Sequence, residues 1–268
     1  MFKAVNPFAL HESLTEQRHR PWKIPEGPWV MQQTWERLLF AHWPIAASDL
    51  RPLIPEPLEI DTFEGQAWIG VVPFYMSHVK PRLSPSVPGL SFFPELNVRT
   101  YVTYRGKPGV WFFSLEAANP IAVEIARKGF HLPYFNATMR CSEKKVVSKT
   151  NAQNRIVYYS QRTHKGAPAA RFEGEYGPAG PVYFSQPGTL EHWLTERYAL
   201  YSSKTHRDGT LSLYRGEIHH KPWPLQAAQA DIQVNTMTAP LEISPLKGSP
   251  LLHYAHRIAV VVWPLVKL

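Results

Sequence analysis

The amino-acid sequence predicts a β-rich α+β protein built on a largely antiparallel β-barrel or curved sandwich with a few short helices. Proline accounts for 26 of the 268 residues. Proline disrupts helix interiors and central strands, so we expect many short elements joined by stiff turns. Aromatic residues reach 13%, with nine tryptophans, which suits strands and an aromatic-lined interior. Strand-like runs follow one another without the regular helices of βαβ units.

The chain begins with a polar segment punctuated by prolines. We expect residues 1–28 to form an N-terminal arm laid over the body, and residues 29–268 to form a single domain. Residues 30–43 are rich in aromatic side chains and have no clean helical period, which favours a strand. Residues 47–51 look like a short helix with Ser48 as its cap.

The central feature is an alternating run that is followed by a turn and a second apolar run. In residues 94–102, successive side chains point to opposite faces of a strand, so one face is polar and the other apolar. Residues 105–109 contain two glycines and a proline, which favour a turn, and residues 110–115 return as the second strand of a hairpin.

The remaining segments give further strands, one long loop and two helices. Residues 78–93 contain several prolines and a glycine, and this loop could cover the mouth of a cavity. Residues 120–127 are predicted to be helical, with Pro120 at the first helical position. Residues 190–200 have helical spacing of apolar residues after the cap Thr189. Further strands are expected at residues 58–60, 67–76, 135–147, 156–163, 171–176, 211–218 and 253–262.

Charge and cysteine content narrow the class of protein. The net charge is +8, but the basic residues are scattered and no long helix carries a cationic stripe, so we expect no nucleic-acid partner. The single cysteine, Cys141, excludes an internal disulfide and a cysteine zinc cluster, and it fits a reducing compartment. The apolar run at residues 258–266 is far shorter than the ~20 residues that span a bilayer. We therefore expect a cytoplasmic protein with no membrane segment.

Several motifs resemble those of known proteins. Residues 50–61 (LRPLIPEPLEID) closely resemble a stretch of acetoacetate decarboxylases, and residues 120–123 resemble the segment before the Schiff-base lysine of that family. The chain is more similar to the YqjF-like bacterial family, a domain of unknown function in the acetoacetate decarboxylase-like superfamily. The resemblance implies a barrel-like, largely antiparallel fold with an internal pocket. Motifs typical of the family are found at residues 35–44, 95–101, 109–115, 132–134, 196–198 and 220–224.

One departure from the decarboxylases affects the expected chemistry. That family has a pair of lysines where residues 131–134 of this chain read His-Leu-Pro-Tyr. A lysine nucleophile attacks a carbonyl after burial and a neighbouring cation have lowered its pKa. Leucine, proline and tyrosine cannot form an imine, so Schiff-base decarboxylation is not expected. The resemblance places the functional glutamate of the family near Glu95 and its functional arginine near Glu36 and Arg37.

The polar face of the alternating strand provides the best candidate site: Glu95, Asn97, Arg99 and Tyr101. Glu95 and Arg99 would lie roughly 13 Å apart along an extended backbone, so they would flank a ligand rather than pair with each other. Inside a pocket, Arg99 could bind a carboxylate through two parallel hydrogen bonds. The same row could instead be a solvated face of a sheet, and the sequence leaves both interpretations open.

Four further residues complete the expected ligand-binding set: Tyr134, Phe112, His42 and Trp43. His42 lies in an apolar stretch, where it could be a general base or a hydrogen-bonded core histidine. No histidines and carboxylates have the spacing of a metal site, so we expect neither a metal nor a cofactor.

These residues support three hypotheses about function. The first is a small-molecule-binding barrel for a small organic acid or an aromatic metabolite. The alternative is a lysine-independent lyase or hydrolase of the same fold, with Glu95 as the acid/base, because burial raises the pKa of a carboxyl group toward neutral pH. The third is a scaffold that dimerises through an edge strand, and a homo-oligomer is compatible with the sequence. A sizeable internal cavity would separate the first two hypotheses from the third.

Overall fold

The computed structural model of the protein describes residues 14–147 and 152–268. Residues 1–13, the first part of the expected arm, lie outside this description. The strands are β1 (Met31–Ile45), β2 (Glu59–Ile60), β3 (Ala67–Pro81), β4 (Phe93–Tyr104), β5 (Lys107–Ala117), β6 (Tyr134–Val147), β7 (Ala152–Arg162), β8 (Arg171–Pro178), β9 (Ala199–Thr205), β10 (Leu211–His219), β11 (Leu225–Asn235), β12 (Leu251–Val262) and β13 (Val266–Lys267). The helices are α2 (Ala47–Leu50), α3 (Pro120–Gly129) and α4 (Leu190–Thr195), with 3-10 turns η1 (Arg51–Leu53) and η2 (Ala239–Leu241).

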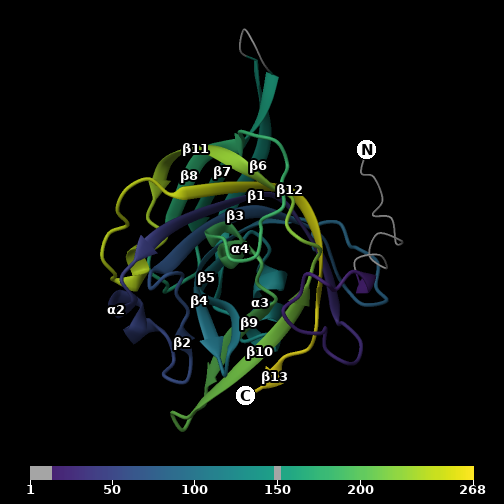
Figure 1. The fold of residues 1–268 in the computed structure, drawn as a ribbon, viewed down its shortest axis with the longest axis vertical. Coiled ribbons are helices and arrows are strands. Elements are labelled where there is room, and N and C mark those ends of the chain that lie inside the picture. The colour runs from purple at the N-terminus through teal and green to yellow at the C-terminus, as the bar shows by residue number, and fades with distance from the viewer. Residues whose placement is uncertain (1–13, 148–151) are drawn as a thin grey trace.

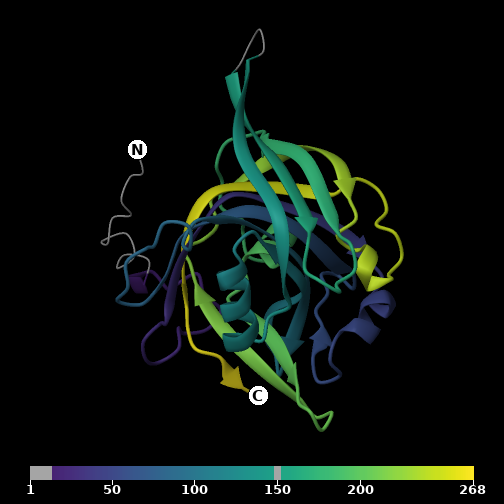
Figure 2. The ribbon, with the colours of Figure 1, turned by 180° about the vertical axis from the view of Figure 1, so that it is seen from behind.

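The strands form one strongly curved sheet with the order β13-β10-β9-β5-β6-β7-β8-β11-β12-β1-β3-β4-β2. Two additional pairings, β5 with β4 and β10 with β12, fold the sheet back on itself (Figure 1). The result is a curved sandwich rather than a single clean barrel. The β6–β7 hairpin extends away from the body, and α3 packs beside β6 and β5 (Figures 1 and 2).

The middle of this sheet is buried on both faces. Along β4, Leu96 and Val98 belong to a core cluster that also contains Tyr158 of β7 and Phe172 of β8. The next residues in the alternation, Glu95, Asn97 and Arg99, are also buried, on the opposite face. That face packs toward a second core cluster, which includes Phe74, Ile218, Trp223 and Val260. The solvated-face interpretation of the polar row is therefore wrong.

The β4–β5 hairpin has the tight turn that its sequence favours. Arg105 and Gly106 both have positive φ, 49° and 75°, as a two-residue type I′ turn requires. Val98 pairs with Ser114 but Arg99 pairs with Phe112, so the strand β5 has one extra residue at this point. This bulge shifts the alternation of β5 by one position.

Residues 14–28, the described part of the expected arm, include side chains that contact β10. The Nη1 atom of Arg20 donates a hydrogen bond of 2.6 Å to the carbonyl oxygen of Ile218. The guanidinium carbon of Arg20 lies 4.6 Å from the centre of the Tyr198 ring. The indole N–H of Trp22 donates to Glu217 at 2.8 Å. These contacts hold the arm next to the strand that ends at His219.

Two local expectations from the sequence differ from the structure. The helix expected over residues 190–200 ends at Thr195, because residues 199–205 pair with β10 as strand β9. The N-cap of α2 is Ala46, without a side-chain hydrogen bond, so Ser48 is not its cap. By contrast, the Asn119 side chain caps α3, accepting hydrogen bonds from two backbone N–H groups.

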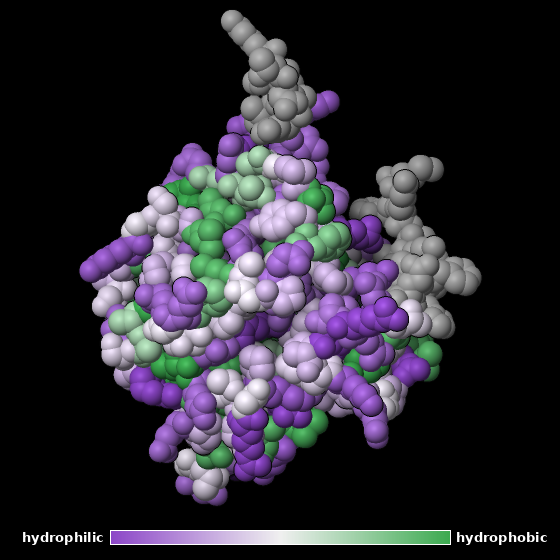
Figure 3. Space-filling model, viewed as in Figure 1, coloured by the Kyte–Doolittle hydropathy of each residue, from purple (hydrophilic) through white to green (hydrophobic). Residues whose placement is uncertain are grey.

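The surface of the molecule is mixed. The face seen in Figure 3 combines hydrophilic residues with smaller hydrophobic areas, as is usual for a folded protein. Among the described residues, no helix combines the length and the hydropathy needed to cross a membrane.

A buried ion pair joins the central sheet to the β6–β7–β8 layer and gives a test of the fold. Arg162 of β7 donates from Nε to Glu116 of β5 at 2.9 Å, and the two side chains are 3% and 0% exposed. Replacing Arg162 with alanine leaves a buried carboxylate without its partner, so we expect the free energy of unfolding in urea to fall by about 3–5 kcal/mol. The control is Lys128→Ala, which breaks the exposed pair with Glu124 and should change little. Equal stability of the two variants would contradict the structural role of the buried pair.

Candidate ligand-binding site

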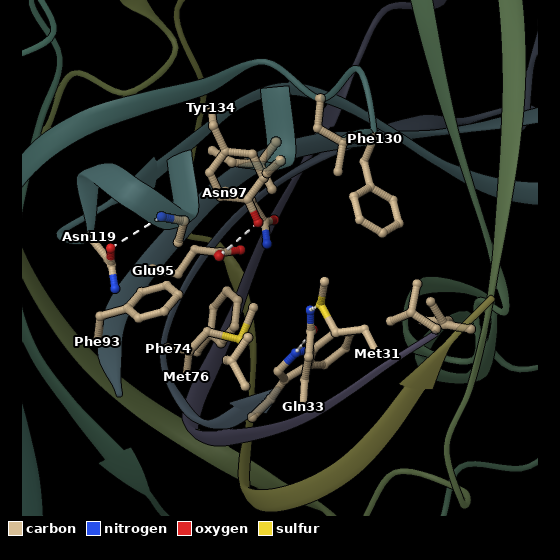
Figure 4. Close-up of a pocket in the computed structure, with 18 of the residues that line it drawn as sticks. Met31, Gln33, Phe74, Met76, Phe93, Glu95, Asn97, Asn119, Phe130 and Tyr134 are labelled. Atoms are coloured by element: carbon tan, nitrogen blue, oxygen red, sulfur yellow. Dashed lines mark hydrogen bonds between the residues drawn. The ribbon is translucent and has the colours of Figure 1, made fainter. Parts of the chain in front are cut away.

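An internal cavity of about 420 Å³ lies beside the polar row of β4. Its size is within the range of roughly 300–1,000 Å³ that is usual for small-molecule sites. Figure 4 shows Glu95, Asn97 and Tyr134 around the same space as Phe130 and Met31, which come from other parts of the chain. The apolar walls include Leu38, Val72, Phe74, Met76, Phe93, Phe112, Leu132 and Trp223.

Strand geometry places three of the four predicted polar residues on the wall of this cavity. Glu95, Asn97 and Arg99 all line it, as does Phe93 before them. They share a face because the side chains of a strand alternate with a period of two. Phe112 and Val110 line the cavity from β5, and after the bulge the next lining residue of that strand is Leu115. Tyr101 belongs to the same row but lies behind Arg99, outside the lining.

Glu95 is a buried carboxyl group, and its hydrogen-bonded partner is Tyr134 of β6, the strand on the other side of β5. The Tyr134 hydroxyl donates to Oε2 of Glu95 at 2.8 Å. Burial raises the pKa of Glu95 to about 8, against the lowering effect of the hydrogen bond from Tyr134. Glu95 is therefore mostly protonated at neutral pH, and it adds no negative charge to the cavity.

Arg99 is a buried cation without a matching carboxylate. Its side chain lies beside the rings of Phe40 and Tyr101, with the guanidinium carbon 5.2 and 5.9 Å from the ring centres. Within residues 14–147 and 152–268, no carboxylate lies within 4.0 Å of it. The Nε atom is buried and has no hydrogen-bond partner, and the same is true of Oδ1 of Asn97.

A second guanidinium, Arg197, was not predicted as a ligand-binding residue. It lines the cavity from the segment that follows α4. Nη1 donates to Asp61 at 2.5 Å, and Nε donates to the carbonyl oxygen of Trp193 at 2.6 Å. The Nη2 atom is buried and has no partner. The sequence marks Arg197 only through the motif at residues 196–198, which can equally serve a structural purpose.

His42 contributes to the support of the site rather than to its surface. Its Nε2 lies 2.6 Å from the Tyr101 hydroxyl, which also donates to the carbonyl oxygen of Leu194 at 2.9 Å. A hydroxyl has one proton, so His42 is the donor to Tyr101. Burial and the nearby Arg99 lower the pKa of His42 well below its ordinary value, which keeps the ring neutral. The sequence left two interpretations of His42 open, a general base or a hydrogen-bonded core histidine, and its position in the structure fits the second.

Gly70 leaves space for the His42 ring and the stem of Arg99. It lies between His42 and Arg99 on neighbouring strands. A Cβ atom at position 70 would lie 2.9 Å from Cδ2 of the His42 ring, which is too close. The sequence alone does not reveal this role, since His42 lies far from Gly70 along the chain.

Trp43 does not line the cavity. It packs in the cluster on the other face of β1, and its indole N–H donates to the carbonyl oxygen of Gly248 at 3.3 Å. The reason is again the alternation of a strand, since His42 and Trp43 are consecutive and must point to opposite faces.

Arg37 also lies outside the lining, and its Nε is 2.8 Å from a carboxylate oxygen of Glu143. In the part of the chain that the structure describes, no group of three or more histidine, cysteine or acidic side chains could hold a metal ion.

Solved structures with the same architecture define the class of this protein. The enduracididine biosynthesis enzyme MppR in complex with pyruvate has a TM-score of 0.62 and 12% identity, covering 92% of this chain and 93% of MppR. An acetoacetate decarboxylase has a TM-score of 0.58 and 16% identity, covering 96% of this chain and 97% of the decarboxylase. At such identities the likeness concerns the fold, and it confirms an acetoacetate decarboxylase-like architecture.

The sequence identifies the family within that class. Residues 32–259 match the model of the DUF2071 family, described as an uncharacterized conserved protein, and the chain belongs to this family. It is 48% identical over 244 residues to the uncharacterized protein YqjF of Bacillus subtilis (strain 168), which covers 91% of this chain and 95% of YqjF. The expected resemblance to the YqjF-like family is confirmed.

The pKa of Glu95 predicts how stability depends on pH. The native pKa of about 8 exceeds the ordinary value of 4.5, so the folded state binds more protons between these limits. The contribution of Glu95 is complete below about pH 4.5 and is lost as the pH rises through 8. In Glu95→Gln this side chain does not titrate. We expect the free energy of unfolding of the parent to fall relative to the variant by about 1.4 kcal/mol per pH unit across this window. Denaturant unfolding at several pH values measures the difference, and parallel pH profiles would refute it.

Proposed function

We propose that this protein binds a small organic acid in the cavity, with Arg99 as the residue that receives its carboxylate. The observation that carries the proposal is the unpaired guanidinium of Arg99, buried in a largely apolar cavity. Removing a cation from water is costly unless an opposite charge compensates for it. A ligand carboxylate supplies that charge, and it can form two parallel hydrogen bonds with the guanidinium.

The neighbouring groups favour an anion over a neutral ligand. Glu95 is mostly protonated at neutral pH, so it does not neutralise Arg99. The carboxylate of Asp61 already forms an ion pair with Arg197. The polar wall thus has one cation more than the acidic groups around it can balance, and a single ligand carboxylate restores the balance.

The rest of the cavity suits an apolar body attached to that carboxylate. Aromatic side chains on several walls, such as Phe74, Phe112 and Trp223, offer surface to an aliphatic or aromatic group. The fold relative MppR has been solved in complex with pyruvate, itself a small organic acid. This likeness supports a small acid as the ligand class, while the choice of Arg99 rests on the geometry of this chain.

An Arg99→Ala variant tests the proposal. Because the guanidinium lacks a countercharge, its removal should leave the protein folded while the affinity for phenylacetate falls about 30-fold or more. Isothermal titration calorimetry measures the affinity. Phenylacetamide, which has the same shape without the charge, should bind parent and variant equally.

The matched control is Arg105→Ala, at the exposed turn that follows the same strand. This variant has the same change in net charge but leaves the cavity intact, so its affinity for phenylacetate should equal that of the parent. Equal affinity of the parent and Arg99→Ala would overturn the proposed role of Arg99.

Glu95 favours a second candidate function, a lysine-independent lyase or hydrolase. A carboxyl group with a pKa of about 8, held by Tyr134 at the edge of a cavity, can donate or accept a proton near neutral pH. Tyr134 occupies the segment where the decarboxylases have their lysines, and a phenol cannot form an imine. The reaction would therefore use proton transfer by Glu95 and no covalent lysine adduct.

A turnover screen with small keto acids and esters tests this candidate. Any activity found in the parent should be lost in Glu95→Gln, which keeps an acceptor for the Tyr134 hydroxyl but cannot transfer a proton. Treatment with pyruvate and borohydride should leave the protein mass unchanged. Turnover retained in the variant, or a lysine adduct, would contradict this mechanism.

A further inference from the structure

The cavity is elongated along β4. Phe93, Glu95, Asn97 and Arg99 all line it, and the last lies six positions after the first. At about 3.3 Å per residue, this row extends over roughly 20 Å. The cavity is thus much longer than a molecule of the size of pyruvate requires.

The two guanidinium groups of the lining lie at one end of this row. The guanidinium carbons of Arg99 and Arg197 lie 5.9 and 4.8 Å from the centre of the same ring, that of Tyr101. Each guanidinium has one buried nitrogen without a partner, Nε of Arg99 and Nη2 of Arg197. This inner end is therefore the place where a carboxylate is stabilised most strongly.

The opposite end opens between the loop that precedes β4 and helix α3. The loop residues Val87 and Leu90 line the cavity and are also 44% and 40% exposed. Ile121 and Ile125 line it from α3, and each is 55% exposed. Four exposed apolar residues around one opening form a hydrophobic mouth, an arrangement that marks a site for an apolar ligand.

Between the two ends, the walls are mainly apolar. Val72, Phe74 and Met76 follow one another along β3 at every second position, and they lie beside the row of β4 in the same sheet. Glu95 is the ionisable group of this middle section, and its protonated form is compatible with an apolar neighbour. The cavity thus changes from two buried guanidinium groups at the inner end to mainly apolar side chains at the mouth, where Lys80 also lines it.

We propose that the ligand is an elongated amphipathic monocarboxylate, such as an unbranched alkanoate, with its carboxylate between Arg99 and Arg197 and its tail along β4 toward the mouth. This inference rests on the proposed function and specifies its ligand class. A short acid would fill only the inner end and leave most of the apolar wall without contacts.

A series of alkanoates tests the inference on the unmodified protein. Acetate, hexanoate and decanoate carry the same carboxylate and differ only in the length of the tail. Each added CH₂ that enters the cavity should increase the affinity about fourfold, as measured by calorimetry at neutral pH. The Arg99→Ala variant should weaken the binding of hexanoate and decanoate by similar factors, because the carboxylate occupies the same place in both.

A bulky substitution in the outer part of the cavity tests whether the alkyl tail of the ligand extends toward the mouth. Ala126 lines the cavity from α3, and phenylalanine at this position would occupy the space near the mouth. The Ala126→Phe variant should lower the affinity for decanoate about tenfold or more and leave that for acetate unchanged. The matched control is Glu124→Phe, an exposed position of the same helix outside the lining, which should change neither.

The outcomes separate this inference from the proposed function. Equal affinities for acetate and decanoate, both lost in Arg99→Ala, would overturn the elongated ligand and leave the acid-binding function intact. Affinity that rises with chain length but does not depend on Arg99 would overturn the placement of the carboxylate, and with it the proposed function. Absence of binding for all three alkanoates, with phenylacetate still bound through Arg99, would overturn the elongated ligand alone, and absence of binding for phenylacetate as well would overturn both.

Discussion

The structure depends on one constraint, namely that the central strands are buried on both faces. Along β4, Leu96 and Val98 pack into a dry core, while Glu95, Asn97 and Arg99 face an internal cavity. Buried polar groups need compensation, because burial takes them out of bulk water. The chemistry of the site follows from the proton, hydrogen bond or ion pair that compensates each buried group.

Three ionisable groups of the cavity, Glu95, Arg197 and Arg99, differ in whether and how their burial is compensated. Glu95 gains a proton and a hydrogen bond from Tyr134. Arg197 keeps its charge and pairs with Asp61. Arg99 has no carboxylate beside it in the described part of the chain, and its stem lies over the space that Gly70 leaves open. This difference separates Arg99 from Glu95, which has a hydrogen-bonded partner, and from Arg197, which has an ion-pair partner.

The sequence predicted which residues of β4 share a face, because alternation depends only on the geometry of a strand. It could not tell whether the polar face was wet, since an alternating strand of a half-exposed sheet has the same pattern. Arg197 and Gly70 escaped prediction because their partners, Asp61 and His42, are distant in sequence. The position of Trp43 could have been predicted from the sequence. The alternation that places His42 on one face of β1 places its neighbour on the other face.

The bulge opposite Arg99 has a consequence for how this architecture can change in evolution. Inserting or deleting one residue in β4 would exchange its two faces at once, moving aliphatic side chains into the cavity and charges into the dry core. At Phe113 an extra residue is already accommodated, and Val110, Phe112 and Leu115 still reach the same wall. Members of the family should therefore acquire new ligand preferences by substitution within fixed rows, with length variation confined to bulges and loops.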